Sequence, residues 1–530
     1  MNGMRITALG HAGLRVETGG VSVLCDPWFS PEGAFQASWF PYPENLHLLT
    51  PELLSPASIL ISHEHLDHVD KWLLARVSAN VPVIVPRYPS PVLRRKVLAG
   101  GPRPVIELDP WEVMEVAPGV RAFFIPEESP MNHDSAMVIQ AGGRCLLNLN
   151  DARLSAPQLQ AARAEVGGRI DVLAIQGSGA SWYPICYEET PARIADLSLQ
   201  KRHAKLEYVV RAAGIVDPGT VLPFAGPPAF LDPELFQHND QMGEGGIFPD
   251  QQQVARFIGH RGIESKILLP GESLEVGADR KSAANEFAAF SFADRSDYLA
   301  AYAARRSSQV EAARRRYPEP TDDLWEPFLD YFARVLEMSS YFNEKIGMRV
   351  GFDVSGAGGG RWSVDFRSGG TGVDRRLVDC QYIYRFESRW LAPILSHAVP
   401  WEDFFLSLRF KAWRHPDLYN DHLLGLLKFA WPEALDATEA YERAAEAEES
   451  IVVHIDGKDY RIQRYCPHAG QDLRETGELL TGGKIRCLGH HYEFDLQTGE
   501  CVNGRAPPLL TEEIGPQGPP DSRLCVDSPE

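Results

Sequence analysis

Residues 59–68 read Ile-Leu-Ile-Ser-His-Glu-His-Leu-Asp-His, and this stretch decides the fold of the first half of the chain. The three apolar residues 59–61 predict a short buried strand, which ends where the polar side chains begin. The imidazoles of His63, His65 and His68 and the carboxylate of Asp67 share the loop after that strand. Imidazole nitrogens and carboxylate oxygens bind divalent metals, and a dense set of them can hold two cations a few ångströms apart. The stretch therefore predicts a metal site.

Short apolar or alternating runs surround this stretch over residues 1–275. The runs at residues 4–9 and 21–25 are bounded by glycines or turn residues, and residues 83–85 and 172–175 are wholly apolar. Such runs, alternating with short helical segments, are typical of buried strands in an α/β sandwich. The predicted fold class of the chain is therefore α/β.

The loop motif resembles the H-x-H-x-D-H signature of the metallo-β-lactamase fold, and Gly10-His11-Ala12 and Cys25-Asp26-Pro27-Trp28 add to that resemblance. It implies an αββα sandwich over residues 1–275 with a dinuclear metal centre. It also implies the ligands, which are His63 and His65 for the first metal, Asp67 and His68 for the second, His133 as the family's next histidine, and Asp151 as the carboxylate that bridges the metals. All of these except His133 are also expected to be catalytic. Glu64, between two ligands, is expected to support a ligand.

One departure from that family concerns the last ligand. The fold usually ends its metal set with a histidine after a late strand and proline, where this chain has Pro223-Phe224-Ala225-Gly226. Either the second metal has an open position, or His238 takes the place of the missing histidine. His11 is expected either to contact a ligand or to serve a structural turn.

A second cluster of metal-binding residues lies near the end of the chain. Cys466-Pro467-His468 and Cys487-Leu488-Gly489-His490 are separated by 18 residues. Two thiolates and two imidazoles in this arrangement suit a [2Fe–2S] cluster, with the cysteines on one iron and the histidines on the other. A structural zinc site with two cysteines and two histidines is the alternative.

This tail resembles the Rieske fold over residues 448–526, in its ferredoxin and oxygenase type. The resemblance implies an all-β domain whose cluster is held by Cys466, His468, Cys487 and His490. It also implies a one-electron relay, which needs an external donor such as a reductase, a ferredoxin or a cytochrome.

Two further segments lie between the metal motifs. Residues 276–320 are expected to form a helical connector, since residues 280–316 are rich in Ala, Arg and Glu and are followed by Pro318 and Pro320. Residues 321–435 predict an α+β domain with a hairpin around the glycines at 356–360, and they resemble a sterol-carrier-protein module. An acidic helix over residues 436–450 is expected to lead into the tail.

Charge and composition exclude several functional classes. The 530 residues carry 52 Lys and Arg against 72 Asp and Glu, a formal charge of −20, which disfavours binding to nucleic acid or to an anionic membrane. No apolar run is long enough for a membrane span. Eight cysteines are too few for a disulfide framework, so a cytoplasmic location is expected. A homo-oligomer is compatible with these features.

The two metal motifs together indicate an oxidoreductase. A dinuclear site of this fold usually activates water, and hydrolysis moves no net electrons, so an electron relay on the same chain would be idle. With iron in the first site, reduction of O₂ would use those electrons. The prediction is an iron-dependent monooxygenase with one or two non-haem irons. The alternatives are a zinc or manganese hydrolase, of lactonase or phosphodiesterase type, with a redox-sensing Rieske domain, and a non-catalytic electron carrier.

The pairing of modules also resembles the CMP-N-acetylneuraminate hydroxylase family, through residues 179–184, 223–226 and 246–250. This resemblance implies O₂-dependent hydroxylation of a small molecule, with a nucleotide sugar as the candidate substrate. Residues 179–184 are expected to form a pocket wall. Lys201, Arg202 and Lys205 could meet a phosphate, but a solvated helical face is the favoured interpretation.

Overall fold

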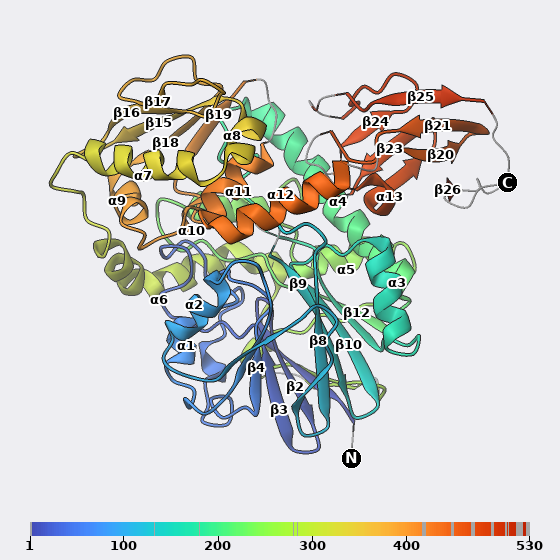
Figure 1. The fold of residues 1–530 in the computed structure, drawn as a ribbon. Helices are drawn as coiled ribbons and strands as arrows, with labels where there is room; N and C mark the ends of the chain where they lie inside the picture. The colour runs from blue at the N-terminus through green and yellow to red at the C-terminus, as the bar shows by residue number, and fades with distance from the viewer. Residues whose placement is uncertain are drawn as a thin grey trace.

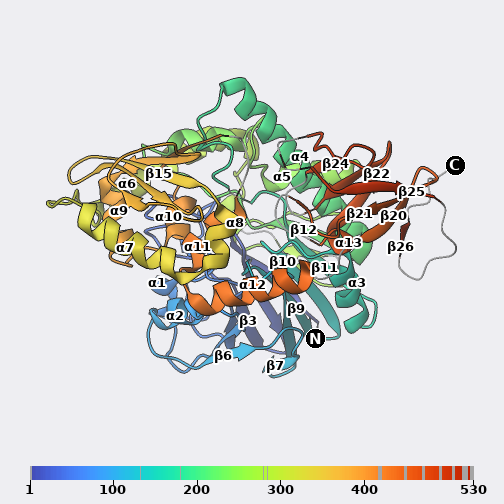
Figure 2. The ribbon, with the colours of Figure 1, turned by 45° about the horizontal axis from the view of Figure 1, so that its top comes forward.

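The computed structural model describes residues 3–131, 133–179, 181–278, 280–282, 285–415, 420–446, 450–467, 472–488, 492–503, 506, 508–515 and 523–525. A first domain with two facing sheets is followed by a middle domain with one sheet and a tail domain with two small sheets (Figure 1). The middle and tail domains lie side by side over one end of the first domain (Figure 2). None of the helices within these residues is long and apolar enough to cross a membrane.

The first domain is a sandwich of two sheets. One has the order β14-β13-β1-β2-β3-β4-β5-β6, with the bounds β1 (Arg5–Gly10), β2 (Gly13–Thr18), β3 (Val21–Cys25), β4 (Ser58–Leu60), β5 (Val83–Pro86), β6 (Val105–Leu108), β13 (Ser273–Glu275) and β14 (Arg280–Ser282). The other has the order β12-β11-β10-β9-β8-β7, with the bounds β7 (Met114–Ala117), β8 (Val120–Pro126), β9 (Ser135–Ala141), β10 (Arg144–Asn150), β11 (Val172–Gln176) and β12 (Thr220–Phe224). Apolar side chains of the facing sides, such as Val16, Phe124 and Leu146, form the core between them.

Helices cover the outer faces of both sheets. The first sheet is covered by α1 (Lys71–Leu74) and α2 (Val92–Leu98), and the second by α3 (Ala156–Glu165), α4 (Pro191–Val216) and α5 (Gln251–Gly259). The predicted αββα sandwich is therefore confirmed. Strands β3 to β6 pair in parallel, as do β10 to β12, so the loops that follow β3, β4, β10 and β12 gather at one edge of the sandwich.

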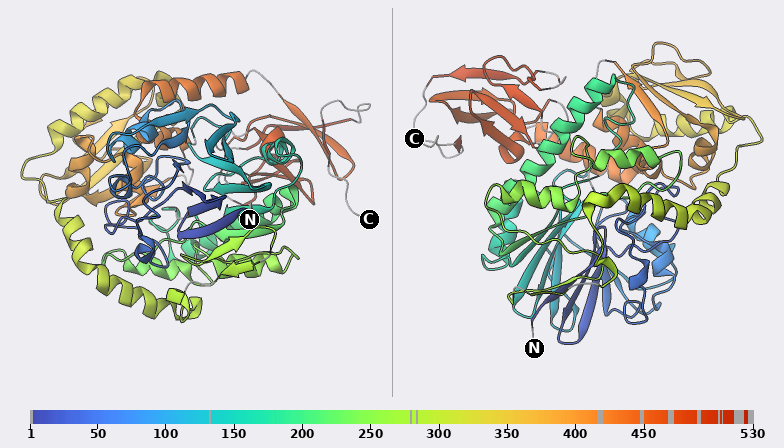
Figure 3. Two further views of the ribbon diagram at one scale, coloured as in Figure 1. Left: turned by 90° about the horizontal axis from the view of Figure 1, so that it is seen from below. Right: turned by 180° about the vertical axis from the view of Figure 1, so that it is seen from behind.

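The long helix expected over residues 280–316 is shorter than predicted. Residues 280–282 form β14 on the sheet edge, and the helix α6 covers only Arg295–Arg315. The aromatic rings of Phe290 and Phe292 explain the delay, since Phe290 packs against Tyr42 and Tyr298 before the helix begins. Helix α6 then runs along the boundary between the first and middle domains (Figure 3).

The middle domain is built on a sheet with the order β17-β16-β15-β18-β19, whose bounds are β15 (Arg349–Ser355), β16 (Gly360–Asp365), β17 (Gly372–Asp374), β18 (Tyr382–Glu387) and β19 (Lys411–Arg414). The expected hairpin at the glycines joins β15 and β16. The helices are α7 (Trp325–Met338), α8 (Ser340–Ile346), α9 (Ser388–Leu395), α10 (Trp401–Leu406), α11 (Asp421–Phe429) and α12 (Pro432–Glu446). Phe352 and Trp401 share one apolar cluster with Trp28 and Phe230 of the first domain, so the two domains have a common core.

The tail domain contains a sheet of the order β25-β21-β20-β26 and another of the order β22-β23-β24. Their bounds are β20 (Ile451–Ile455), β21 (Lys458–Ile462), β22 (Gly477–Leu480), β23 (Lys484–Cys487), β24 (Glu493–Asp495), β25 (Thr511–Ile514) and β26 (Arg523–Cys525). The short helix α13 (Leu473–Thr476) packs near α3. In addition, Nη1 of Arg211 in α4 lies 3.5 Å from Oε2 of Glu478 in β22. The tail therefore rests on the helices of the first domain.

A buried ion pair joins the first and middle domains and is a test of this arrangement. Arg409 Nη2 donates to Asp232 Oδ2 at 2.7 Å and to the Gln36 carbonyl at 3.0 Å, and both charged side chains are nearly inaccessible. Because Arg409→Met leaves the Asp232 carboxylate buried without this partner, the free energy of unfolding should fall by about 3–5 kcal/mol in denaturant titrations.

The control for this variant is Arg385→Met, which removes a half-exposed pair with Glu188 and should cost no more than about 1 kcal/mol. The double variant Asp232→Leu/Arg409→Met should recover part of the loss, because it leaves neither charge alone. Equal losses for Arg409→Met and Arg385→Met would contradict the proposed role of the pair.

Candidate metal centre

The loop after β4 carries the predicted ligands at the edge where the parallel strands end. His63, Asp67 and His68 are buried, and the chain turns tightly because the backbone amides of His68 and Val69 both donate to the His65 carbonyl. Asp70 then caps α1, accepting from Trp72 and Leu73, and also accepts from the Phe29 amide at 2.7 Å. The turn within the loop and the end of the loop are thus fixed by hydrogen bonds from backbone amides.

Three overlapping groups of metal-ligating atoms form within the described residues, each with its atoms within 4.8 Å of one another. They are His11, Asp67 and His68; His63, His68 and Asp151; and His63, His65 and Asp134. Because His63 and His68 belong to two groups each, the three groups form one continuous site. Five of the six predicted ligands therefore come together in space.

The donor set fits divalent metal ions. His63 Nε2 and His65 Nδ1 face each other at 2.8 Å, and His68 Nε2 lies 3.5 Å from Asp151 Oδ1. Oxygen atom Oδ1 of Asp67 is buried without a hydrogen-bond partner within the described residues. Lone pairs that converge in a buried space at these separations are the arrangement that a bound cation satisfies.

A hydrogen-bond network behind the ligands orients two of the imidazoles. Asp26, which follows β3, accepts from the Ser62 amide and hydroxyl at 2.8 Å each, and its Oδ2 lies 3.1 Å from His68 Nδ1. The Ser62 hydroxyl also lies 2.8 Å from His63 Nδ1. Since these contacts use the ring nitrogens on the far side, they leave Nε2 of His63 and His68 directed into the site.

The sixth predicted ligand, His133, lies beside the site and belongs to none of the three groups. Its Nδ1 is 2.9 Å from Oε1 of Glu64, and its ring stacks on Tyr88 with centroids 4.6 Å apart. Glu64 therefore orients His133, as expected of a residue that supports a ligand. The neighbouring Asp134 was not predicted, although it follows His133 directly in the sequence, and its Oδ1 lies 3.6 Å from His63 Nε2.

Two residues of the middle domain reach the site, and no sequence pattern indicated them. Glu402 of α10 places Oε1 3.0 Å from His65 Nε2, and Lys428 of α11 places Nζ 2.8 Å from the same oxygen. They lie more than 300 residues from the loop, so only the folded chain brings them together. The middle domain therefore contributes directly to the surroundings of the metal ligands.

Burial and neighbouring charges set the protonation of the site. Burial alone would raise the pKa of Asp67, but the neighbouring imidazoles of His68 and His11 outweigh that effect and lower it well below its usual value. Burial lowers the pKa of His63 strongly, which keeps this imidazole neutral and able to donate a lone pair. Burial also disfavours the charged form of His65, but Glu402 outweighs that effect and raises the pKa of His65 to about 9.

His238 does not take the place of the missing late histidine. It lies in none of the three groups, because the 3-10 helix Phe236–Met242 packs its ring against Phe230, with centroids 5.6 Å apart. Burial lowers the pKa of His238 to about 4, so this side chain is a neutral core residue. This alternative from the sequence is therefore wrong.

The basic residues of α4 differ from the predicted solvated face. Arg202 and Lys205 are buried, because the loops packed on α4 leave carbonyl groups that need donors. Arg202 donates to the Gly243 and Gly246 carbonyls at 3.0 Å each, and Lys205 donates to the carbonyl of Gly179 at 2.5 Å. These cations hold residues 243–247 and the start of the predicted pocket wall; Ala180 within that wall lies outside the described residues.

The second metal motif is described in part. Cys466 and Cys487 are buried in the core of the tail domain, and Cys487 ends β23. The two predicted histidine ligands, His468 and His490, lie outside the described residues. The two buried thiols, on separate loops of one small core, fit a cluster that is bound between two loops.

The role of Asp26 can be tested by metal removal. Asp26→Asn keeps the size of the side chain but removes the charge behind His68, so the affinity for a cation should fall about 10- to 100-fold. Titration of metal-free protein with zinc against a chelator measures this loss. Asp171→Asn, at a buried carboxylate that binds Arg144 far from the loop, should leave the affinity unchanged; an equal loss there would contradict the proposed role.

Comparisons with known proteins agree with both motifs. Residues 22–224 match the model of a Beta-lactamase superfamily domain, and residues 430–512 match the model of a Rieske [2Fe-2S] domain. Two solved structures are similar to about half of the chain. The metallo hydrolase Igni18 of Ignicoccus hospitalis is 16% identical over 51% of this chain and 97% of its own, with a TM-score of 0.35. The diiron beta-hydroxylase CmlA of Streptomyces venezuelae is 17% identical over 52% of this chain and 55% of its own, with a TM-score of 0.36. Likenesses this distant carry no conclusion about activity.

Two curated relatives are similar along nearly the whole chain. A protein of Mycolicibacterium smegmatis named "Putative Rieske 2Fe-2S iron-sulfur protein" is 30% identical over 96% of this chain and 100% of its own length. A protein of the same description from Mycobacterium tuberculosis strain H37Rv is 31% identical over 95% of this chain and 98% of its own. The chain therefore belongs to this family of Rieske 2Fe-2S iron-sulfur proteins. In this chain, the Rieske domain follows a domain of the β-lactamase superfamily.

Proposed function

We propose that this protein is an iron-dependent oxygenase in which the Rieske cluster passes single electrons to the metal centre of the first domain. Insertion of one oxygen atom of O₂ into a C–H bond, with the other leaving as water, takes up two electrons and two protons. Iron in the first domain would supply the reduction of O₂, and the cluster would supply one-electron transfer. The electrons would come from an external reductase, ferredoxin or cytochrome.

The observation that carries this proposal is the position of α11. Its first residue, Asp421, is half-buried near the tail domain, and its pKa is raised well above the usual value by burial of its carboxyl group first and then by Glu442 and the predicted cluster ligand Cys487. Seven residues later, Lys428 pairs with Glu402, which contacts His65. Seven residues of α-helix span about 10 Å, so one helix of a single chain extends from the cluster side to the metal side.

The residues around the site have distinct roles in this proposal. Lys428 balances the charge of Glu402, and Glu402 fixes the ring of His65. Asp67 and Asp151 stay ionised, because the neighbouring His68 imidazole lowers the pKa of both carboxyl groups despite their burial. The resemblance to the CMP-N-acetylneuraminate hydroxylase family suggests a nucleotide sugar as the small-molecule substrate.

A zinc or manganese hydrolase with a redox-sensing Rieske domain is the second candidate. The observation that favours it is the ligand set itself, since imidazoles and carboxylates in a buried site suit zinc as well as iron. It differs from the oxygenase in needing neither O₂ nor an electron donor. The two functions are therefore separated by the dependence of turnover on O₂.

Rapid mixing with O₂ tests the oxygenase. Anaerobically purified protein, reduced and then mixed with O₂ and a panel of nucleotide sugars, should reoxidise its cluster and form hydroxylated product. The cluster is followed by its EPR signal and the product by mass spectrometry. His63→Ala/Asp67→Ala should keep the reduced-cluster signal but form no product. Full turnover of a zinc-loaded protein without O₂ would overturn the proposal in favour of the hydrolase.

Lys428→Met tests the path along α11. Loss of this cation leaves the Glu402 carboxylate beside His65 without its counter-charge, so O₂-driven reoxidation of the cluster should slow about 10-fold. Stopped-flow absorbance of the cluster measures the rate. Lys458→Met, at an exposed pair with Glu513 in the tail domain, should leave it unchanged. Equal rates for the two variants would exclude a contribution of Lys428.

A further inference from the structure

We propose that His11 is a metal ligand and completes the second cation position of the first domain in place of the late histidine. This inference rests on the metal centre of the proposed function, and it is independent of the reaction that the centre performs. It replaces both sequence expectations for His11, which were a contact to a ligand and a structural turn. The two observations that carry it are the spacing of the donor atoms and the neighbour of the His11 backbone.

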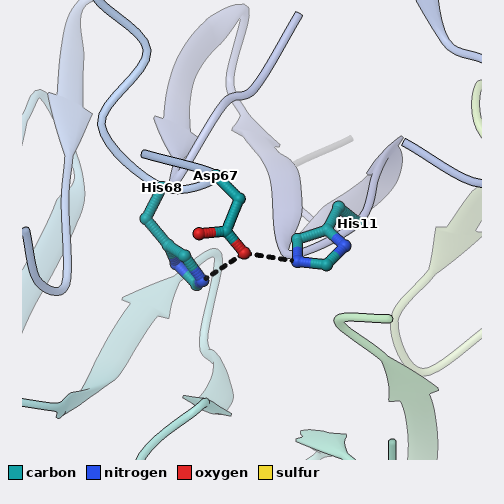
Figure 4. Close-up of side chains that lie close together, drawn as sticks. All are labelled: His11, Asp67 and His68. Carbon is teal, nitrogen blue, oxygen red and sulfur yellow. Dashed lines mark hydrogen bonds and ion pairs between the residues drawn. The ribbon is translucent and has the colours of Figure 1, made fainter. Parts of the chain in front are cut away.

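His11 lies in the turn between β1 and β2, with its ring directed to the loop ligands (Figure 4). Its φ of 48° is unusual for a residue with a side chain, and such a backbone persists only where its surroundings hold it. The ring is buried and stands edge-on to Trp28, with centroids 5.1 Å apart at 83°. The position of this imidazole is therefore fixed by packing.

The donor atoms have the spacing of ligands that share one cation. His11 Nε2 lies 2.8 Å from Asp67 Oδ2, and the same oxygen lies 3.8 Å from His68 Nε2 (Figure 4). Two ligands at about 2.1 Å from one ion are about 3.0–3.4 Å apart for angles between 90° and 109°. The two measured distances lie on either side of this range, and small shifts of the three side chains would bring all three donor atoms onto one ion.

The backbone of His11 contacts the segment after β12, near which the resemblance to the metallo-β-lactamase fold would place the last histidine. The Ala225 amide, just after β12, donates to the His11 carbonyl at 3.1 Å. Ala225 is fully buried, so its methyl group leaves no donor atom at this place. The turn before β2 therefore brings an imidazole next to the strand end from which the usual one is absent.

A hydrogen bond alone would also explain the 2.8 Å distance, with His11 donating to Asp67 as an outer partner. The two possibilities predict different states of Nε2. If His11 is a metal ligand, Nε2 has no proton and gives its lone pair to the metal; if His11 is an outer partner, Nε2 carries the proton that it donates to Asp67. Nitrogen Nδ1 of His11 is buried without a hydrogen-bond partner within the described residues. It is thus a position where a proton would exchange slowly and be observed directly.

Cobalt loading of the full-length protein, with its cluster oxidised, separates the two possibilities. Metals bound in the first domain are removed by a chelator under conditions that leave the cluster absorbance intact. Co²⁺ is then added to one sample and Zn²⁺ to another. The proton NMR spectra of the cobalt-loaded and zinc-loaded proteins are then compared. Signals next to the Rieske cluster are the same in both spectra, so the differences identify the imidazole N–H signals that cobalt shifts. We expect shifted signals from the four histidines of the three groups, which are His11, His63, His65 and His68; a set of shifted signals that lacks His11 would overturn the proposal.

His11→Gln supplies the second measurement. The variant should bind one cobalt ion per chain instead of two and lose one shifted signal, while His238→Gln, at a buried histidine outside the site, should keep both ions and all signals. Two tightly bound ions in His11→Gln would overturn the assignment. Since neither measurement uses substrate or O₂, a failure of the oxygenase proposal would appear separately, as cobalt binding with the His11 signal shifted but no hydroxylated product.

Discussion

The contact of Glu402 with His65 is the interaction on which the arrangement of the two metal motifs depends. It joins a carboxylate of the middle domain to a ligand on the loop of the first domain, and Lys428 keeps that carboxylate charged by lowering its pKa. Without it, the centre would be a site of the first domain alone. With it, helix α11 has one end beside the predicted metal ligand His65 and its other end toward Cys487 of the tail domain.

Sequence reasoning succeeded where neighbouring residues carry the chemistry. His63, His65, Asp67 and His68 lie within six consecutive positions after a buried strand, and the parallel strands bring Asp151 to the same edge. The loop residues follow from local spacing, whereas Asp151 was implied by the resemblance to the metallo-β-lactamase fold. The sandwich and the Rieske domain were predicted from local patterns and family resemblance together.

Sequence reasoning failed where long-range packing decides. No spacing in the sequence connects Glu402 or Lys428 with the loop that carries His65. The helix expected from residue 280 starts only at Arg295, because Phe290 is bound in an aromatic cluster. Lys205 looked like a surface cation, and its burial follows from carbonyl groups of loops distant in the sequence.

The aromatic cluster that spans the first and middle domains also limits how this chain can be divided. Trp28 and Phe230 have partners such as Phe352 and Trp401, and all four are almost fully buried. A fragment that ended after the sandwich would expose the apolar side chains of this shared core to solvent. The first and middle domains are therefore expected to change together in evolution, because exchanging either one alone would disrupt their shared core.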